Sequence, residues 1–591
     1  MYIKIIFVGV LVISMLLNAC GGNGGTKVDP VVSVPSPSPS PSPEPVSIDK
    51  IKLNQLGYTL SAQKIAVVPS VNTTQFSVVS ASTGSVVLSD NLGPAASWPP
   101  AGSEPVRTAD FSALTTAGEY RIRVDGLNDS SVFTVNDNVY NAVHSAALKA
   151  FYFNRSSSAL EETHAGIYAR ALGHADTNVH VFADAATASR PEGTSLSASK
   201  GWYDAGDYGK YVVNSGIATY TLMAAYERFS AFYEAIDINI PESGDDAPDI
   251  LDEVMWNLEW LESMQDLDGG VYHKLTTLGF SGSVMPSATN NQRYFIGKTT
   301  TASLDFSALM SVASRIFANL ENEFPGKAVA YEQAARDAYS WALNNPDVTY
   351  SQDSRVSTGT YSDQSVNDEF MWAAAELYIL TGESGFWDDF QNRAGSDAAG
   401  IASWPNVRAL GYISLSNHAE SLLDVTDFQA VQDAITDTAD IEVSNHQSSA
   451  YRVGMLANDF TWGSNANALN KAMILMEANA IKASSDYVNA AQSLLDYVLG
   501  RNPTDYSYVT GFGELSPMNI HHRPSLADGI AEPIPGFVAG GAQPGQQDNC
   551  DYPSDLAARS YIDDYCSYST NEIAINWNAP LVYVLAAIMN N

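Results

Sequence analysis

The sequence predicts a mainly α protein in which a helical toroid, residues 137–591, follows an all-β immunoglobulin-like sandwich, residues 48–136. In the first region, short apolar runs rich in β-branched residues alternate with period two between turn residues, a pattern typical of strands. In the second, apolar residues recur at helical spacing, and Gly, Pro and Asn gather in long connections. Short strands at this spacing favour an immunoglobulin-like sandwich, and the many helix pairs favour a toroid over a small bundle.

We expect one strand or helix wherever apolar residues recur at strand or helix spacing. Strands are expected at residues 64–68, 75–79, 85–88, 118–124 and 131–135. Helices are expected at residues 139–153, 215–231, 249–265, 300–320, 329–344, 368–381, 465–483 and 485–499. The motifs that carry chemistry fall in the loops between these helices.

The N-terminus carries an export signal. A short basic start and an apolar run too short to span a bilayer end at Leu17-Asn18-Ala19-Cys20. This resembles a bacterial lipoprotein signal peptide, residues 1–19, after which Cys20 is lipidated; an ordinary secretory signal is the alternative. Residues 20–47 are Gly-rich and then Ser/Pro-rich, which predicts a disordered linker. We expect an exported protein anchored by lipid in a bacterial outer membrane, on its periplasmic or cell-surface face.

The chain is strongly acidic. Lys and Arg number 30 and Asp and Glu 66, which gives a formal net charge of −36. Such a surface repels nucleic acid and anionic membranes, so the only membrane contact expected is the lipid anchor. A neutral polysaccharide is compatible with this charge, although acidity also serves solubility.

Two cysteines remain beside Cys20. In an oxidising compartment Cys550 and Cys566 are expected to form a disulfide around the C-terminal motif. Two free buried thiols are the alternative, and a zinc site lacks further ligands at metal spacing.

Two carboxylate clusters carry the candidate chemistry. Asp204 and Asp207 flank an Ala-Gly pair among aromatic residues, so both can face one pocket and hold a water molecule, although helix capping or calcium binding would use the same pair. Glu572 lies among Ile573, Ala574 and Ile575, which should favour its protonated form, as a general acid requires.

A third element is the Pro-bounded segment that contains His521, His522 and Arg523. Its imidazoles and guanidinium can bind sugar hydroxyls and hold a neighbouring carboxylate ionised. A zinc site competes with this interpretation, but no third ligand stands at metal spacing.

These motifs resemble glycoside hydrolase family 9, a family of cellulases with an (α/α)6 barrel. The C-terminal match comprises Tyr561, Asp563, Tyr568, Glu572, Ala574, Asn578 and Ala579, and the central match comprises Ser507, Val509, Thr510, Gly513, Ile520, His521 and Arg523. The chain departs from the central pattern at Leu515. The segment that opens with Leu53 to Tyr58 resembles the immunoglobulin-like domain that precedes one branch of the family.

The resemblance implies an inverting mechanism. Asp207 would be the general base, Asp204 would help to hold the attacking water, and Glu572 would be the general acid. His521 and Arg523 would bind the sugar. Asp563 is counted with the catalytic residues, because it would support the side of the site that carries the general acid. Tyr568 and Trp462 are the further substrate-binding candidates, Trp462 because it lies in a Gly-containing loop.

The resemblance implies no required cofactor. A structural calcium ion is compatible with the family and with the acidic loop at residues 242–246, although a solvated loop has the same composition. Some members of this branch carry a zinc site made of Cys and His just before the first Asp motif. Zinc is not expected here, because the corresponding residues 170–180 contain His174 and His180 but no cysteine.

The sequence therefore predicts a monomeric endoglucanase that cleaves β-1,4-glucan. One alternative is an exo-acting enzyme on short oligosaccharides, either a β-glucosidase or cellodextrinase, or an exo-β-glucosaminidase. Another is a non-catalytic surface protein that binds glycans, although binding alone does not need three carboxylates.

Overall fold

The structure is a computed structural model that describes residues 50–395 and 398–591. The predicted signal peptide, Cys20 and the linker lie outside the described residues. Within the described part, no helix combines the length and the apolar character needed to cross a membrane.

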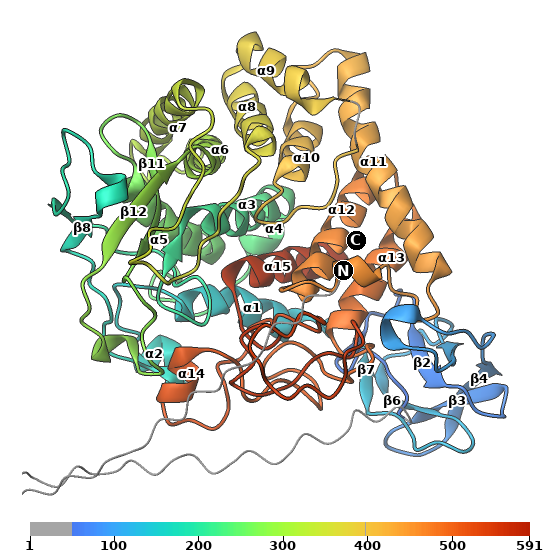
Figure 1. Cartoon of the computed structure of the whole chain (residues 1–591). Helices are drawn as coiled ribbons and strands as arrows, with labels where there is room; N and C mark the ends of the chain where they lie inside the picture. Colours follow the sequence, from blue (N-terminus) through green and yellow to red (C-terminus); the bar gives the residue numbers. More distant parts are fainter. Residues whose placement is uncertain (1–49, 396–397) are drawn as a thin grey trace, which may run out of the picture. The chain divides into compact units, whose positions relative to one another are not determined.

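The first folded region is a β-sandwich. Its strands are β1 (Gly57–Tyr58), β2 (Ile65–Pro69), β3 (Gln75–Ser80), β4 (Val86–Asn91), β5 (Val106–Asp110), β6 (Gly118–Arg123) and β7 (Phe133–Val135). One sheet has the order β1-β7-β6-β3-β4, and β2 pairs with β5 (Figure 1). The sheets enclose Tyr58, Phe111 and Phe133, whose rings lie 5.2 to 5.8 Å apart. Strand β5, which sequence analysis missed, has the weakly apolar sequence Val-Arg-Thr-Ala-Asp.

The second region is an (α/α)6 barrel. Its longer helices are α1 (Asn141–Phe153), α3 (Val212–Arg228), α5 (Asp249–Met264), α6 (Thr300–Phe317), α7 (Lys327–Asn344), α8 (Asn367–Thr381), α9 (Ser384–Ala394), α10 (Arg408–His418), α11 (Val425–Ser448), α12 (Ser464–Ile481), α13 (Ser485–Val498) and α15 (Ile575–Met589). Helix α15 packs on α3, α3 on α6, α6 on α8 and α8 on α10, while α12 packs on α15 and α11 contacts both α10 and α12. The remaining helices pack outside this ring.

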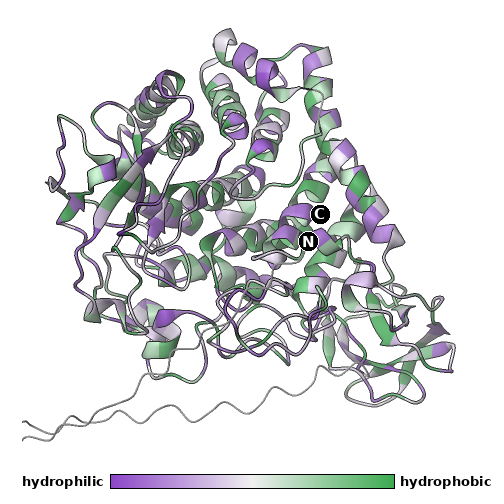
Figure 2. Ribbon diagram, viewed as in Figure 1, coloured by the Kyte–Doolittle hydropathy of each residue, from purple (hydrophilic) through white to green (hydrophobic). Residues whose placement is uncertain are grey.

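Hydropathy follows the position of each helix. Residues Ile575 to Ile588 of α15 are all buried, which explains why this helix is apolar at almost every position. Figure 2 shows hydrophobic residues along the central helices and hydrophilic residues along the outer helix α11. Sequence analysis missed α9, α10, α11 and α15, because polar surfaces or continuous burial obscure their period.

A small sheet lies beside the barrel and leads into the first carboxylate cluster. Its strands are β8 (Val179–Val181), β9 (Ser195–Leu196), β10 (Lys210–Tyr211), β11 (Val271–Thr276) and β12 (Tyr294–Thr299), in the order β10-β11-β12-β8-β9. Every residue of β11 is buried. Strand β10 begins three residues after Asp207 and ends directly before α3, so this sheet fixes the C-terminal end of the segment that carries Asp204 and Asp207.

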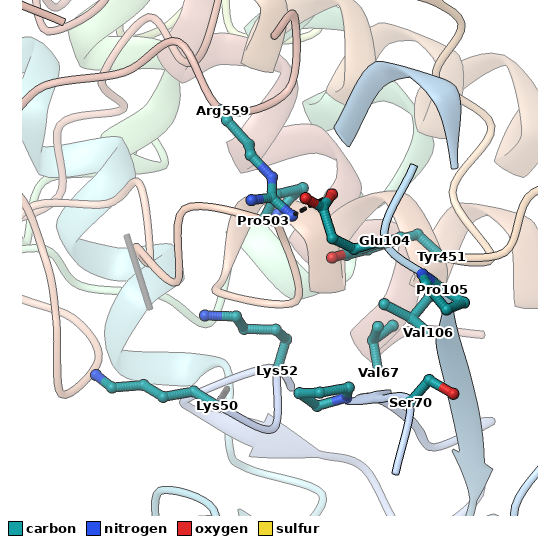
Figure 3. A pocket seen from close by; sticks show the side chains of 11 residues that line it. Lys50, Lys52, Val67, Ser70, Glu104, Pro105, Val106, Tyr451, Pro503 and Arg559 are labelled. Atoms are coloured by element: carbon teal, nitrogen blue, oxygen red, sulfur yellow. Dashed lines mark ion pairs between the residues drawn. The ribbon is translucent and has the colours of Figure 1, made fainter. Parts of the chain in front are cut away.

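The sandwich contacts the barrel through buried polar groups. The side chain of Asn54 donates a 2.9 Å hydrogen bond to Asp496, which also pairs with Arg501 at 3.4 Å. A pocket of about 230 Å³ lies at this junction (Figure 3). Glu104 is the one carboxylate that lines it, and it pairs with Arg559 at 3.6 Å. This pocket therefore lacks the two carboxylates that acid/base hydrolysis requires.

Candidate active site

Backbone pairing brings the two carboxylate clusters together. Ala205 forms a bridge with Ala574, and His521 forms a bridge with Glu572. The amide of Ile575 donates to the carbonyl of Asp204 at 2.9 Å. Gly206 permits this approach, because a Cβ atom there would lie 2.1 Å from the carbonyl oxygen of His521. The Ala-Gly pair between the two aspartates is thus required by the packing of the three motifs.

The clusters open into one cleft of about 860 Å³. Seven of the eleven predicted site residues line it: Asp204, Asp207, Glu572, His521, Arg523, Trp462 and Tyr568. Further aromatic walls come from Phe280, Tyr361, Trp404 and Trp577. A cleft with three carboxylates and several aromatic rings suits a sugar polymer, because rings stack on the apolar faces of sugars.

Asp204 is buried at the base of the cleft. Its Oδ1 accepts a 2.7 Å bond from Asn214, and its Oδ2 accepts a 2.6 Å bond from the Tyr361 hydroxyl. Burial, together with the charge of Asp207, raises the pKa of Asp204 to about 7, although the two hydrogen bonds oppose the shift. Asp204 therefore tends to keep its proton at slightly acidic pH.

Asp207 is held by its neighbours in the chain. Its Oδ2 accepts from the Tyr211 hydroxyl at 3.1 Å and from the amide of Gly209 at 3.0 Å. Both bonds go to the same oxygen. The carboxylate is thus oriented, and Oδ1 is available to a molecule in the cleft.

Glu572 precedes α15 and is fixed by its backbone. Its carbonyl accepts a 2.9 Å bond from the amide of Gly540. Burial, then the charges of Asp207 and Asp204, raise the pKa of Glu572 well above its usual value. The protonated form of Glu572 is therefore favoured, in the direction that its apolar neighbours predicted.

His521 and Arg523 are each anchored by hydrogen bonds to backbone carbonyls. His521 donates from Nδ1 to the carbonyl of Tyr565 at 2.8 Å, which leaves Nε2 as an acceptor, and burial lowers its pKa. Arg523 donates from Nη1 to the carbonyl of Gly206 at 2.7 Å and from Nε to that of Ser281 at 2.9 Å. Both side chains are oriented before any substrate binds.

Asp563 does not line the cleft. Its carboxylate accepts from the amides of Met518 and Asn519, each at 2.8 Å, and from the side chain of Asn571 at 3.0 Å. Asp563 therefore joins the segment before His521 to the residue before Glu572. These contacts fit a supporting role, while a direct part in catalysis would need contact with the cleft.

Trp462 and Tyr568 form one aromatic wall. Their rings lie 5.4 Å apart, and Trp462 is 43% exposed, so its ring is accessible in the cleft. Gly463, with φ 82°, allows the turn before α12, where a Cβ atom would meet Trp577 at 2.6 Å. By contrast Trp260, inside α5, is fully buried. Phe280 and Tyr361 were missed, because no motif surrounds either residue.

The predicted disulfide between Cys550 and Cys566 is present. It closes the loop of residues 550–566, which contains Tyr565. The ring of Tyr565 stacks on the imidazole of His521, with the two ring centres 4.6 Å apart. The bond restricts the loop and so helps to hold this wall of the site.

The predicted metal sites remain predictions. In residues 50–395 and 398–591, no three His, Cys, Asp or Glu side chains are grouped so that they could hold a metal ion. In the acidic loop, Glu242 instead pairs with Arg155 at 2.9 Å. Both carboxylate oxygens of Asp305 are nevertheless buried without a hydrogen-bond partner in the described part of the chain.

Comparisons with known proteins agree over both regions. Residues 140–585 match the family model for glycosyl hydrolase family 9, and residues 47–129 match the cellulase N-terminal ig-like domain. A xyloglucan-specific endo-beta-1,4-glucanase of Bacteroides ovatus is 40% identical over 555 residues, 91% of this chain and 94% of that protein. Endoglucanase D of Acetivibrio thermocellus is 35% identical over 547 residues, 92% and 83% of the two chains. A solved Bacteroides ovatus GH9 structure has a TM-score of 0.86 at 38% identity, covering 92% of this chain and 99% of that one.

Proposed function

This chain belongs to glycosyl hydrolase family 9 and is a glycosidase, and we propose that it is an inverting endo-β-1,4-glucanase. The observation that carries the proposal is the presence of Asp204, Asp207 and Glu572 in one cleft with aromatic walls. A cleft of this kind can bind a glucan chain and supply a base for water and an acid for the leaving oxygen.

Asp207 acts as the general base. Its Oδ2 is occupied by Tyr211 and Gly209, so we assign Oδ1 to the attacking water. Asp204 holds the same water from the neighbouring position. The water attacks the anomeric carbon from the face opposite the leaving oxygen, and its proton passes to Asp207.

Glu572 acts as the general acid. Its raised pKa favours the protonated form, and it gives this proton to the glycosidic oxygen as the bond breaks. His521 accepts a hydrogen bond from a sugar hydroxyl at Nε2, and the Arg523 guanidinium donates a hydrogen bond to the same sugar. Trp462 and Tyr568 provide a stacking surface for a glucose ring.

A product time course tests the mode of action. Endo action on cellohexaose should release cellotriose, cellobiose and cellotetraose early, before glucose accumulates. Early release of glucose alone would support the exo-acting alternative, and cleavage of a glucosamine hexamer in preference to cellohexaose would support a glucosaminidase. Xyloglucan belongs in the same assay because it is the substrate in the name of the Bacteroides ovatus relative.

Paired variants test the non-catalytic alternative. Asp207→Ala and Glu572→Gln should both abolish hydrolysis while glucan binding, measured by affinity electrophoresis, persists. A protein that only binds glycans would show no hydrolysis in the wild type, and hydrolysis that survives both changes would remove the assignment.

We also propose that the enzyme is an exported, lipid-anchored monomer. The lipoprotein-like signal that ends at Cys20 supports this proposal. Labelled palmitate should enter the wild-type protein but not Cys20→Ser, which should leave the membrane fraction. Label that persists in the variant, or a variant that stays in the membrane, would contradict the anchor.

A structural calcium ion is the last part of the proposal. The acidic loop at residues 242–246 supports this proposal, and the oxygens of Asp305, which lack a hydrogen-bond partner in the described part of the chain, mark a second candidate position. Calcium should raise the melting temperature of the chelator-treated protein, and Asp305→Asn should remove that gain. An unchanged melting temperature would exclude the ion.

A further inference from the structure

Lys274 lies behind the water-side carboxylates, outside the cleft lining. It is on β11 directly opposite Tyr211 on β10, and its Nζ lies 5.8 Å from the centre of the Tyr211 ring. Opposite residues of an antiparallel pair share one face of the sheet, so this contact is fixed by the register. Tyr211 in turn donates to Asp207.

The ammonium group of Lys274 is fully buried and bonds to neutral oxygens. It donates to the carbonyl of Gly359 at 2.7 Å, to Oε1 of Gln352 at 2.8 Å and to the hydroxyl of Thr358 at 3.3 Å. Burial lowers its pKa to about 7, against the attraction of Asp184 and Asp207. A buried cation without a carboxylate at contact distance costs stability, so an apolar side chain would serve a purely structural position better.

All three acceptors belong to the segment 350–361, which also carries one partner of Tyr211 and one partner of Asp204. The amide of Gly359 donates to the Tyr211 hydroxyl at 3.0 Å, and Tyr361 donates to Asp204. Two further β11 side chains hold the same segment, His273 through the carbonyl of Thr360 and Thr276 through Thr358. The segment is therefore fastened along β11, with Lys274 at the centre of the contact.

We propose that Lys274 is a positioning residue for both water-side carboxylates, acting on Asp207 through Gly359 and Tyr211 and on Asp204 through Tyr361. The Tyr211 hydroxyl accepts from Gly359 and must therefore give its own proton to Asp207, which fixes the direction of this bond. This inference rests on the proposed function, because it takes Asp207 and Asp204 as the residues that bind the water.

The test uses Lys274→Met in the full-length protein, with Lys298→Met as a matched control. Lys298 is on the adjacent strand β12, but it pairs with Asp266 and Asp268, and its ammonium group has no hydrogen bond to segment 350–361 among the described residues. Initial rates are measured on cellohexaose and on 2,4-dinitrophenyl β-cellobioside, whose leaving group needs no proton. Loss of positioning should lower kcat about 10- to 100-fold on both substrates and leave KM within about threefold, as expected for one or two charge-assisted hydrogen bonds. Lys298→Met should leave both constants near wild type.

Gly359→Ala tests the same link from the other side and carries the test if Lys274→Met fails to fold. A Cβ atom at Gly359 would lie 3.1 Å from the Tyr211 hydroxyl and displace it without touching Lys274. Its kcat should fall on both substrates, and the double variant should lose no more than the more severe single variant.

The possible outcomes separate this inference from the proposed function. A folded Lys274→Met protein with wild-type kcat, a loss confined to cellohexaose, or additive losses with Gly359→Ala would each overturn the positioning role. Asp207→Asn is run in parallel: if that variant stays active, the assignment of the base is wrong, whereas an inactive Asp207→Asn beside an active Lys274→Met refutes only the role of Lys274.

Discussion

The two sides of the cleft hold their carboxyl groups in different ways. On the water side, side chains from separate segments fix the aspartates: Tyr361 and Asn214 bind Asp204, and Tyr211 binds Asp207. On the leaving-group side, Glu572 is placed by its own backbone, whose carbonyl accepts from the amide of Gly540. A base must be aligned with water, which needs several donors, while an acid must keep a proton and release it, which needs few.

The largest expected effect comes from the water side. Asp207→Asn keeps the shape of the side chain but removes the base, so kcat should fall about 10³- to 10⁴-fold. The loss should be equal on cellohexaose and on dinitrophenyl β-cellobioside, because both need an activated water. A loss confined to cellohexaose would move Asp207 to the leaving-group side.

The leaving-group side should respond differently to the two substrates. Glu572→Gln cannot donate a proton, so hydrolysis of cellohexaose should fall about 10³-fold. Dinitrophenolate leaves without protonation, so hydrolysis of its β-cellobioside should fall less than about tenfold. Initial rates on both substrates give the ratio of the two losses in activity. Equal losses would contradict the role of Glu572 as the acid.

The same contrast explains what the sequence could and could not predict. The environment of Glu572 is local, so its apolar neighbours in the chain predicted the raised pKa. The partners of Asp204 are not local: Tyr361 follows a loop without a motif, and Asn214 lies inside α3 among buried residues. Asp204, Asp207, His521 and Arg523 were found because each motif is compact, whereas Phe280 and Lys274 reach the site only through tertiary packing.

A smaller effect is expected at the aromatic wall, which binds substrate but takes no part in proton transfer. Trp462→Ala removes an exposed ring from the cleft, and KM for cellohexaose should rise about tenfold with kcat nearly unchanged. Trp462→Tyr, which retains a ring, serves as the control and should recover most of the affinity. A fall in kcat without a change in KM would show that the residue acts on chemistry instead.

The smallest effect concerns stability and pH. The folded-state pKa of Asp204 is raised from 3.8 to about 7, so the protonated form stabilises the fold, and this contribution is lost as pH rises through 7. The side chain in Asp204→Asn stays neutral at every pH. The free energy of unfolding of this variant, relative to that of the wild type, should therefore rise by about 1–3 kcal/mol between pH 5 and pH 8, and its relative melting temperature should rise with it. A constant difference over this range would contradict the raised pKa.

The central claim is that the two clusters act on opposite faces of the glycosidic bond, and the anomer of the first product tests it most directly. Proton NMR of cellohexaose hydrolysis, recorded before mutarotation, distinguishes the two anomers at the new reducing end. Direct attack by water held on Asp207 and Asp204 predicts the α anomer first. Early appearance of the β anomer would require a covalent intermediate on one carboxylate and would contradict the separation of roles between Asp207 and Glu572.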